Sequence, residues 1–348
     1  MRFYHGQHRY YCGVDLHARS MYLCILDAHG AIVFHDNLRC DREAFLQAVA
    51  PFRDDLAVCA ECIFCWYWLA DLCAEHDIVF VLAHALYLKA IHGAKAKNDR
   101  VDAHKLAVLL RGGVIAQAHV YPPRMRPTRD LLRRRLFFAR KRAELLTHIR
   151  NTFHQYNLPR PPAGRRIQAA HGPKLVARVP EAAVRRSLEA DLQLCQFYDP
   201  LIRDLEKTIE HLAHHHAPQS LARLRTIPGI GRILGLTLLY EIETIERFPT
   251  VQDFSSYCRL VKPEKSSAGK RLGTSGARIG NAHLKWAFSE AAVCFLHANP
   301  RGQNYRKRLR RRHGKGKSLS ILAAKLGRAT YFMLKQQRPF DMDRFLRD

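Results

Sequence analysis

Lys95-Ala-Lys-Asn-Asp-Arg-Val-Asp-Ala-His104 places two carboxylates, Asp99 and Asp102, three residues apart in front of an apolar run. In a helix, residues i and i+3 share a face, so both carboxylates point the same way. Paired acids inside a basic stretch suit a Mg²⁺ site for chemistry on a phosphodiester. The same pattern is typical of an ordinary helix N-terminus, with Asp99 as N-cap and Asp102 favouring the helix dipole. This stretch alone leaves both interpretations open.

The segments before this stretch have the pattern of a mixed sheet. Runs rich in β-branched and aromatic residues, bounded by turn residues, predict strands at residues 10–14, 21–26, 31–34, 56–60 and 78–82. Helices are expected at residues 41–49 and 66–75, and another at Asp99 and Asp102. An antiparallel meander followed by alternating helices and strands predicts a ribonuclease-H-like α/β domain.

Two further acids fall at the ends of predicted strands. Asp15 ends the first strand and Glu61 ends the fourth. Carboxylates at strand ends and at a helix start can converge on one edge of a sheet, where two metal ions about 4 Å apart would bind. Each acid alone is more often a turn residue, but four in this order on this topology are uncommon by chance. The candidate metal ligands are therefore Asp15, Glu61, Asp99 and Asp102.

Composition points to a polyanionic partner. The 348 residues favour two domains, and 57 Lys and Arg against 31 Asp and Glu give a formal net charge of +26. Such an excess favours nucleic acid, because neutralising phosphates and releasing counterions supply the affinity. A membrane surface is the competing polyanion, but no apolar run approaches about 18 residues and no signal pattern opens the chain. We expect a cytoplasmic protein without a membrane partner.

Residues 121–217 are predicted to form a helical connector between a domain at residues 1–120 and another at residues 218–348. A proline-rich start leads into a long helix with an apolar stripe. Its opposite face carries six cations, Arg133, Arg134, Arg135, Arg140, Lys141 and Arg142. They would repel one another unless something anionic lies against them, so Arg133, Arg134, Arg140 and Lys141 are candidate nucleic-acid contacts.

A second helical segment of the connector has a heptad pattern. Apolar residues from Cys195 to Leu212 are spaced alternately three and four apart, which predicts a coiled-coil seam and a contact between two copies of the chain. Pro200 falls inside the seam. The helix therefore either kinks there or starts anew with Asp199 as its cap.

The region from residue 218 opens with Leu224-Arg-Thr-Ile-Pro-Gly-Ile-Gly-Arg-Ile-Leu234, which predicts a helix-hairpin-helix. Its glycines allow backbone N–H groups to approach a DNA phosphate without reading sequence. Gly229, Gly231 and Arg232 are the candidate contacts. An ordinary turn between two helices is the alternative interpretation.

Residues 265–281 alternate small residues with cations. Ser266, Ser267 and Ser275 are expected to be exposed hydroxyls in a loop that attracts phosphate. Such a loop suits either passive phosphate binding or a serine nucleophile. Residues 301–317 hold nine Lys or Arg and no acid, which predicts another nucleic-acid surface. The candidate contacts in both stretches are Lys270, Arg271, Arg278, Arg308, Arg311 and Arg312.

With these acids and this serine loop, the chain resembles the DEDD-type insertion-sequence transposases of the IS110 group, relatives of the pilin-gene invertases. The resemblance runs from Gly13-Val-Asp-Leu-His17 to about Lys335. It is carried by Lys97-Asn-Asp-Arg-Val-Asp-Ala103, by Ile227-Pro-Gly-Ile-Gly231, and by Ser267-Ala-Gly through Gly280-Asn281.

The resemblance implies a RuvC-like N-terminal domain, a coiled coil, and a mostly helical C-terminal transposase domain with an essential serine. It assigns the acidic tetrad to Asp15, Glu61, Asp99 and Asp102. Ser267 is the preferred nucleophile. Relatives carry Ser-Gly where this chain has Ser266-Ser267-Ala268, so Ser266 and Ser275 stay open.

The resemblance also implies a mechanism. A noncoding bridge RNA pairs with target and donor DNA, Ser267 attacks a phosphodiester to give a phosphoserine, and the tetrad binds Mg²⁺. Tetrad and serine come from different protomers of a homo-oligomer, a dimer or a tetramer on DNA, associated with the bacterial nucleoid. The rival hypotheses are a junction-resolving nuclease without a covalent intermediate and a non-enzymatic nucleic-acid-binding protein.

Overall fold

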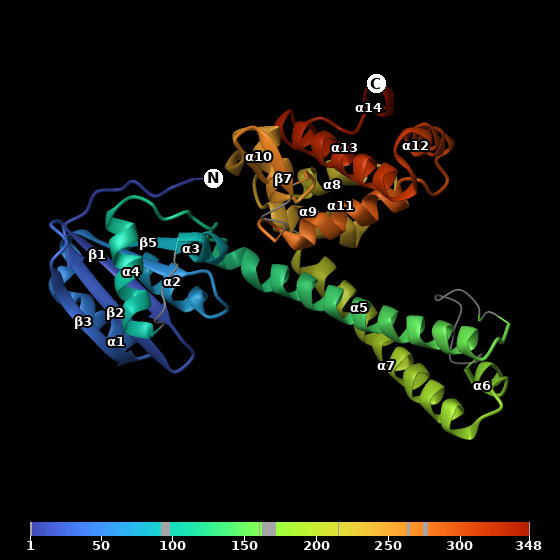
Figure 1. Cartoon of the computed structure of the whole chain (residues 1–348), viewed down its shortest axis with the longest axis horizontal. Coiled ribbons are helices and arrows are strands. Elements are labelled where there is room, and N and C mark those ends of the chain that lie inside the picture. The colour runs from blue at the N-terminus through green and yellow to red at the C-terminus, as the bar shows by residue number, and fades with distance from the viewer. Residues whose placement is uncertain are drawn as a thin grey trace. The chain divides into compact units, whose positions relative to one another are not determined.

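The computed structural model of the chain describes residues 2–91, 98–159, 161, 172–214, 216–262, 265–273 and 278–347. The chain divides into two compact units, Met1–Arg124 and Met125–Asp348. The first unit is a mixed α/β domain and the second is mostly helical (Figure 1), as the sequence predicts. The finer division of the second unit into a connector and a C-terminal domain stays a prediction.

The described part of the first unit contains a five-stranded sheet in the order β3-β2-β1-β4-β5. Its strands are β1 (Tyr10–Leu16), β2 (Ser20–Asp27), β3 (Ile32–Arg39), β4 (Leu56–Glu61) and β5 (Val79–Ala83). β1, β2 and β3 are antiparallel neighbours, whereas β4 runs parallel to β1 and β5 parallel to β4. The predicted strands are confirmed, because β-branched and aromatic side chains suit a pleated, half-buried surface.

Helices cover both faces of this sheet. They are α1 (Arg42–Val49), the 3₁₀ helix η1 (Ala50–Asp55), α2 (Trp66–Glu75), α3 (Ala85–Ile91) and α4 (Asp99–Arg111). Successive side chains of a strand point to opposite faces. Val14 of β1 therefore shares one core with Phe45 of α1 and Leu69 of α2. Tyr11 shares the other core with Leu106 of α4.

Gly13 lets α4 lie directly against β1. A Cβ atom at this position would lie 2.2 Å from the carbonyl oxygen of Ala103 and 2.4 Å from the amide nitrogen of Ala107, both backbone atoms of α4. We expect Gly13→Ala to lower the free energy of unfolding by about 1–3 kcal/mol, because the helix must move off the sheet. Urea unfolding checks this. The control Gly112→Ala meets nothing closer than 3.3 Å, and equal stability of the two variants would contradict the prediction.

The second unit is built from helices and one small hairpin. The elements from its start are η2 (Pro123–Met125), α5 (Arg126–Gln155), α6 (Gly172–Val176), α7 (Ala182–Leu212), α8 (Pro218–Arg225), α9 (Arg232–Ile242), η5 (Ile245–Arg247), α10 (Val251–Tyr257), β6 (Lys265–Ser267), β7 (Lys270–Gly273), α11 (Ala282–Cys294), α12 (Pro300–His313), α13 (Lys315–Lys335) and α14 (Met342–Leu346). The predicted pair of helices around the Pro-Gly-Ile-Gly turn corresponds to α8 and α9.

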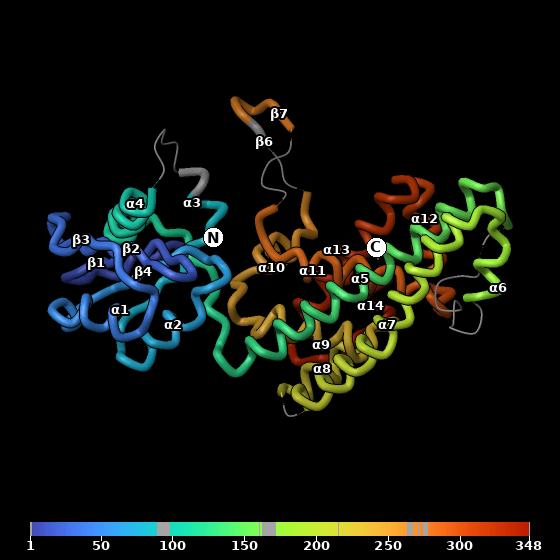
Figure 2. The backbone as a smooth tube through the Cα atoms, turned by 90° about the horizontal axis from the view of Figure 1, so that it is seen from below, coloured from blue at the N-terminus to red at the C-terminus, as the bar shows by residue number. Residues whose placement is uncertain are grey.

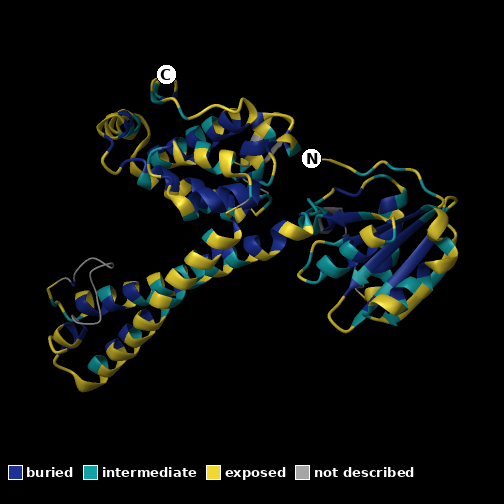
Figure 3. Ribbon diagram, turned by 180° about the vertical axis from the view of Figure 1, so that it is seen from behind, coloured by how far each residue is buried: buried dark blue, intermediate teal, exposed yellow. Residues whose placement is uncertain are grey.

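Helices α5 and α7 form an antiparallel pair. Three ion pairs join them: Arg135–Glu206, Arg142–Asp199 and His148–Asp191. The residue numbers of the partners decrease on α7 as they increase on α5, so the two helices run in opposite directions. Leu192 and Cys195 of α7 share a buried cluster with Ile149 of α5, whereas Leu212 at the end of the seam is exposed. Figure 3 shows buried and exposed residues alternating along both helices. The predicted seam thus has a partner in its own chain, and a contact between copies stays a prediction. α7 runs through Pro200, so the alternative of a new helix at Asp199 is wrong.

Helix α9 lies in the middle of the largest core of this unit. Every residue from Leu234 to Ile242 is buried, and the helix packs against α11, α8 and α5. A helix that is buried on all sides has no solvated polar face. The acid on α9, Glu241, therefore depends on partners from other elements. None of the described helices combines the length and the apolar character that crossing a membrane requires.

Candidate active site and nucleic-acid surfaces

Parallel pairing of β1 and β4 brings Asp15 and Glu61 to the same edge of the sheet. Val14 pairs with Ala60, and the two acids are the next residues along each strand. Both side chains are half-buried. The convergence predicted from the strand ends therefore follows from the register of this one strand pair.

The helix α4 presents the other two acids. Its N-cap is Asn98, whose side-chain oxygen accepts a hydrogen bond from the amide of Val101 at 2.8 Å. The interpretation of Asp99 as the N-cap is therefore wrong. With Asn98 in that role, the carboxylates of Asp99 and Asp102 do not cap the helix, although both still lie in its first turn. Lys105 lies 3.6 Å from the Asp102 carboxylate.

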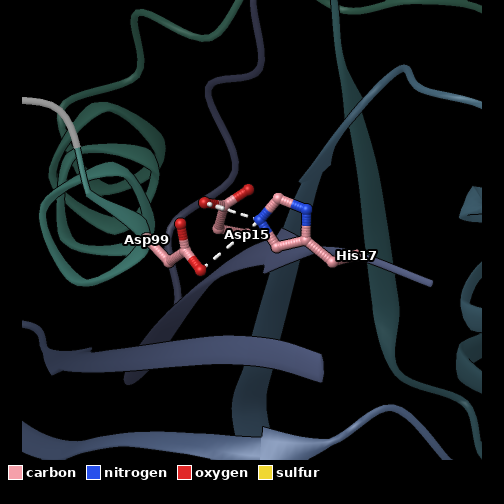
Figure 4. Close-up of side chains that lie close together, drawn as sticks. All are labelled: Asp15, His17 and Asp99. Carbon is pink, nitrogen blue, oxygen red and sulfur yellow. Dashed lines mark ion pairs between the residues drawn. The ribbon is translucent and has the colours of Figure 1, made fainter. Parts of the chain in front are cut away.

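His17 joins this cluster, which sequence reasoning missed. Its Nε2 atom lies 3.5 Å from Asp15 Oδ2 and 3.6 Å from Asp99 Oδ2 (Figure 4). One ligand atom from each of these three residues lies within 4.8 Å of the others. The sequence did contain one indication of this. In an extended chain, side chains two positions apart point to the same side, so His17 is expected on the same side of the strand as Asp15.

The charges of the four acids act on one another. Burial is the largest cause that raises the pKa of Asp15, and the negative charges of Asp99, Asp102 and Glu61 raise it further, while His17 opposes them. Among the described residues, the structure brings ligand atoms of Asp15, His17 and Asp99 close together, whereas Glu61 and Asp102 are not part of that group and act on Asp15 through their charges. Carboxylate oxygens, with one imidazole nitrogen, are donors that divalent cations accept. The residues present fit a divalent metal, although the catalytic role of each stays a prediction.

Ser267 lies at the tip of the β6–β7 hairpin, which extends away from α10 and α11 (Figure 2). It is exposed and pairs with Lys270 across a turn formed by Ala268 and Gly269. Both turn residues have positive φ, 49° and 74°, a geometry that favours glycine. This explains physically why a glycine after the serine would be the commoner choice. Ser275 and the side chain of Ser266 lie outside the described residues.

The cations on α5 are mostly paired with acids of the same chain. The pairs are Arg133–Glu241, Arg135–Glu206, Arg142–Asp199 and, within α5, Lys141–Glu144. Acids of α5, α7 and α9 thus lie against these cations without any external anion, and contact of Arg133 and Lys141 with nucleic acid stays a prediction. Arg134 and Arg140 are exposed, and the Arg134 guanidinium lies over the ring of Phe138 at 4.6 Å.

The turn between α8 and α9 uses its two glycines differently. Gly229 has φ +85°, and a Cβ there would lie 2.4 Å from the carbonyl carbon of Cys294, so this glycine serves close packing against the end of α11. Gly231 precedes the exposed start of α9 and has no atom within 4 Å of such a Cβ. Arg232 forms an ion pair with Glu210 at 2.7 Å. Of the two glycines, only Gly231, at the exposed N-terminus of α9, leaves room for a phosphate.

The remaining predicted cations lie on the surface. Lys270 in β7, Arg278 after the hairpin, and Arg308, Arg311 and Arg312 in α12 are all exposed. The side chain of Arg271 lies outside the described residues. These positions are available to a phosphate backbone, and their contact with nucleic acid stays a prediction.

Comparisons with known proteins agree with this architecture. The family model DEDD_Tnp_IS110, described as a transposase, matches residues 12–158, and a model described as the transposase IS116/IS110/IS902 family matches residues 221–307. The transposase for insertion sequence element IS1111A of Coxiella burnetii (strain RSA 493 / Nine Mile phase I) is 22% identical over 339 residues, or 94% of this chain and 90% of that protein. The insertion element IS110 uncharacterized 43.6 kDa protein of Streptomyces coelicolor is 32% identical over 120 residues, or 34% of this chain and 29% of that protein.

An α/β unit with an acidic cluster, followed by a helical unit matched by a transposase model, defines an enzyme that acts on DNA. The chain belongs to the IS110 group of insertion-sequence transposases. The four acids lie inside the segment that the DEDD model matches, and that family implies a divalent metal.

Proposed function

We propose that this transposase cuts and rejoins DNA through a phosphoserine intermediate formed by Ser267, with Mg²⁺ held by Asp15, Glu61, Asp99 and Asp102. The observation that carries the proposal is the close group of Asp15, His17 and Asp99, with Glu61 following the strand that pairs with β1 and with the charges of Glu61 and Asp102 acting on Asp15. The exposed Ser267 in a hairpin supports it. The sheet order β3-β2-β1-β4-β5 supports a RuvC-like, ribonuclease-H-like domain as the carrier of the tetrad.

The reaction exchanges one phosphorus–oxygen bond for another. The Ser267 oxygen attacks phosphorus, its new bond forms as the bond to one deoxyribose oxygen breaks, and the serine proton ends on the released deoxyribose hydroxyl. Attack by a hydroxyl of another strand on the phosphoserine then rejoins DNA and frees the serine. Bound Mg²⁺ would supply positive charge beside the phosphate oxygens. Phosphodiester energy is conserved throughout.

The partners follow from the same proposal. A noncoding bridge RNA from the element pairs with target and donor DNA, and exposed cations such as Arg134, Arg140, Lys270 and Arg308 bind backbone phosphates. Tetrad and serine act on one phosphate from different protomers of a dimer, or of a tetramer on DNA. The open N-terminus of α9 at Gly231 supports a further phosphate contact in a helix-hairpin-helix.

Covalent trapping tests this proposal. The full chain, expressed with the noncoding flanks of its gene, is incubated with labelled DNA that carries the element ends, with Mg²⁺ or with EDTA. We expect a denaturant-resistant protein–DNA adduct that needs both metal and RNA, with phosphoserine found by mass spectrometry. Cleaved ends without an adduct would support a water-using, junction-resolving nuclease instead. DNA binding without any cleavage would support a non-enzymatic binding protein.

A further inference from the structure

Glu241 is a buried carboxylate surrounded by donors from distant segments. It is 2% exposed, and it accepts hydrogen bonds from Arg129 Nε at 3.1 Å, from Arg133 Nε at 2.6 Å and from Asn281 Nδ2 at 2.7 Å. Burial opposes ionisation, but the hydrogen bond from Arg133 and the positive charges of Arg129 and Arg133 lower the pKa of Glu241 to about 2. The carboxylate is therefore ionised at neutral pH and orients whatever donates to it.

Asn281 connects Glu241 to two other elements. Its Oδ1 atom accepts hydrogen bonds from the amides of His283 and Leu284 and so caps α11, at 2.8 and 3.0 Å. The backbone N–H of Asn281 donates to the carbonyl of Tyr257, at the end of α10, at 2.6 Å. Asn281 thus joins the start of α11 and the buried acid of α9 through its side chain, and the end of α10 through its backbone.

Residues next to Asn281 also connect the end of α10 to the start of α11. Arg259 donates from Nε and Nη2 to the Gly280 carbonyl at 2.9 and 2.6 Å, and also to the Arg278 carbonyl. Gly280 has φ +91°, and a Cβ there would lie 2.5 Å from the Tyr257 carbonyl oxygen, so only glycine permits this approach. The chain leaving α10 and the chain entering α11 are therefore tied together at Arg259 and Gly280, on the two segments that lead to and from the β6–β7 hairpin.

The described side chains of the β6–β7 hairpin are largely surrounded by solvent. A Cβ at Gly269 or at Gly273 would find no atom within 4 Å, and Ser267 and Leu272 are exposed. The described contacts that join the two segments carrying the hairpin are those of Arg259 with Gly280 and of Tyr257 with Asn281. A buried charge network is suited to that task, because its hydrogen bonds fix one geometry where apolar packing tolerates several.

We propose that Glu241, Asn281 and Arg259 form a clamp that positions the Ser267 hairpin for attack on phosphorus. They are positioning residues, because they act through the hairpin and not on the DNA. This inference rests on the proposed serine chemistry. It adds three residues that hold the hairpin in the position from which Ser267 reaches phosphorus.

Asn281→Asp tests the clamp with little change in shape. The aspartate keeps the Oδ1 acceptor that caps α11, but it replaces the amide donor with a second carboxylate oxygen facing Glu241. We expect the rate of adduct formation at saturating DNA to fall about 10- to 100-fold, as for a misplacement near 1 Å. The Kd for DNA should stay at the wild-type value. Amide exchange at residues 265–273 should accelerate.

Asn299→Asp is the matched control. Asn299 caps α12 through the Gly302 amide at 3.0 Å and is buried to a similar extent, but its Nδ2 atom has no hydrogen-bond partner among the described residues. We expect it to form the adduct at the wild-type rate. Adding Glu241→Gln to Asn281→Asp should recover part of the rate, because the glutamine amide can donate to the new aspartate.

A folded Asn281→Asp variant that forms the adduct at the wild-type rate would overturn the clamp. If this variant fails to fold, Arg259→Lys decides the question, since it keeps the charge and loses the paired hydrogen bonds to Gly280 and Arg278. A wild-type rate in Arg259→Lys then overturns the clamp equally. If the wild-type chain forms no adduct at all, the serine chemistry fails, and amide exchange in the hairpin still tests the clamp independently.

Discussion

Ser267→Ala is expected to form no covalent protein–DNA adduct, and its strand-transfer rate should fall on the order of 10⁶-fold, as when other enzymes lose a nucleophile. The reason is that alanine offers no oxygen to bond with phosphorus, while the hairpin keeps its backbone. Denaturing gels with labelled DNA measure the adduct, and product sequencing measures strand transfer. DNA binding and metal affinity should be unchanged, because Ser267 is exposed at a hairpin tip.

Three other serines serve as comparisons for this result. Ser289 on α11 is exposed and donates to the Lys285 carbonyl, so Ser289→Ala should behave as wild type. Ser266→Ala and Ser275→Ala should retain the adduct. An adduct that persists in Ser267→Ala and disappears in one of these two would move the nucleophile to that serine.

Asp15→Asn is the second substitution with a large expected effect. The amide keeps the shape of the side chain and removes the charge of an acid on which Glu61, Asp99 and Asp102 all act. Loss of metal-dependent stabilisation worth several kcal/mol corresponds to a fall of at least about 10³-fold in adduct formation. Titration calorimetry with Mn²⁺ or Mg²⁺ should also show weaker binding, a readout that Ser267→Ala leaves unchanged.

Asp36→Asn is the control for this charge change. Asp36 is exposed on β3, an edge strand of the same sheet. β3 pairs with β2, where Leu23 lies opposite Asp36, and β3 does not pair with β1 or β4, the strands that carry Asp15 and Glu61. We expect wild-type metal affinity and adduct formation from Asp36→Asn. Unchanged metal affinity in Asp15→Asn would remove Asp15 from the ligand set and weaken the case for a metal at this edge.

The acidic cluster was largely predictable because its parts obey local rules. Strand patterns placed Asp15 and Glu61 at strand ends, and helical spacing placed Asp99 and Asp102 on one face. The pairing of β1 with β4, which places the two strand-end acids side by side, was not predicted and comes from the structure. His17 was missed because its approach to Asp99, which lies on another element, depends on where α4 crosses the sheet.

Charge pairing was less predictable. The basic face of α5 has the sequence of a free polyanion-binding surface, yet Glu241, Glu206 and Asp199 neutralise much of it. These acids lie 57 to 108 residues away along the chain. Sequence spacing on one helix carries no information about such partners, because they depend on the packing of other helices.

By itself the sequence determined what depends on neighbours along the chain: the succession of strands and helices in the first unit, the acids at strand ends, the apolar seam of α7 and the net charge. Side-chain periodicity and turn chemistry act over a few residues, so they can be read in one dimension. Tertiary structure alone decided which partners meet: α5 against the seam of α7, Asn98 as the cap in place of Asp99, and Glu241 against Arg129, Arg133 and Asn281. Such choices depend on competing hydrogen bonds and ion pairs between distant segments, which are settled only when the chain is folded.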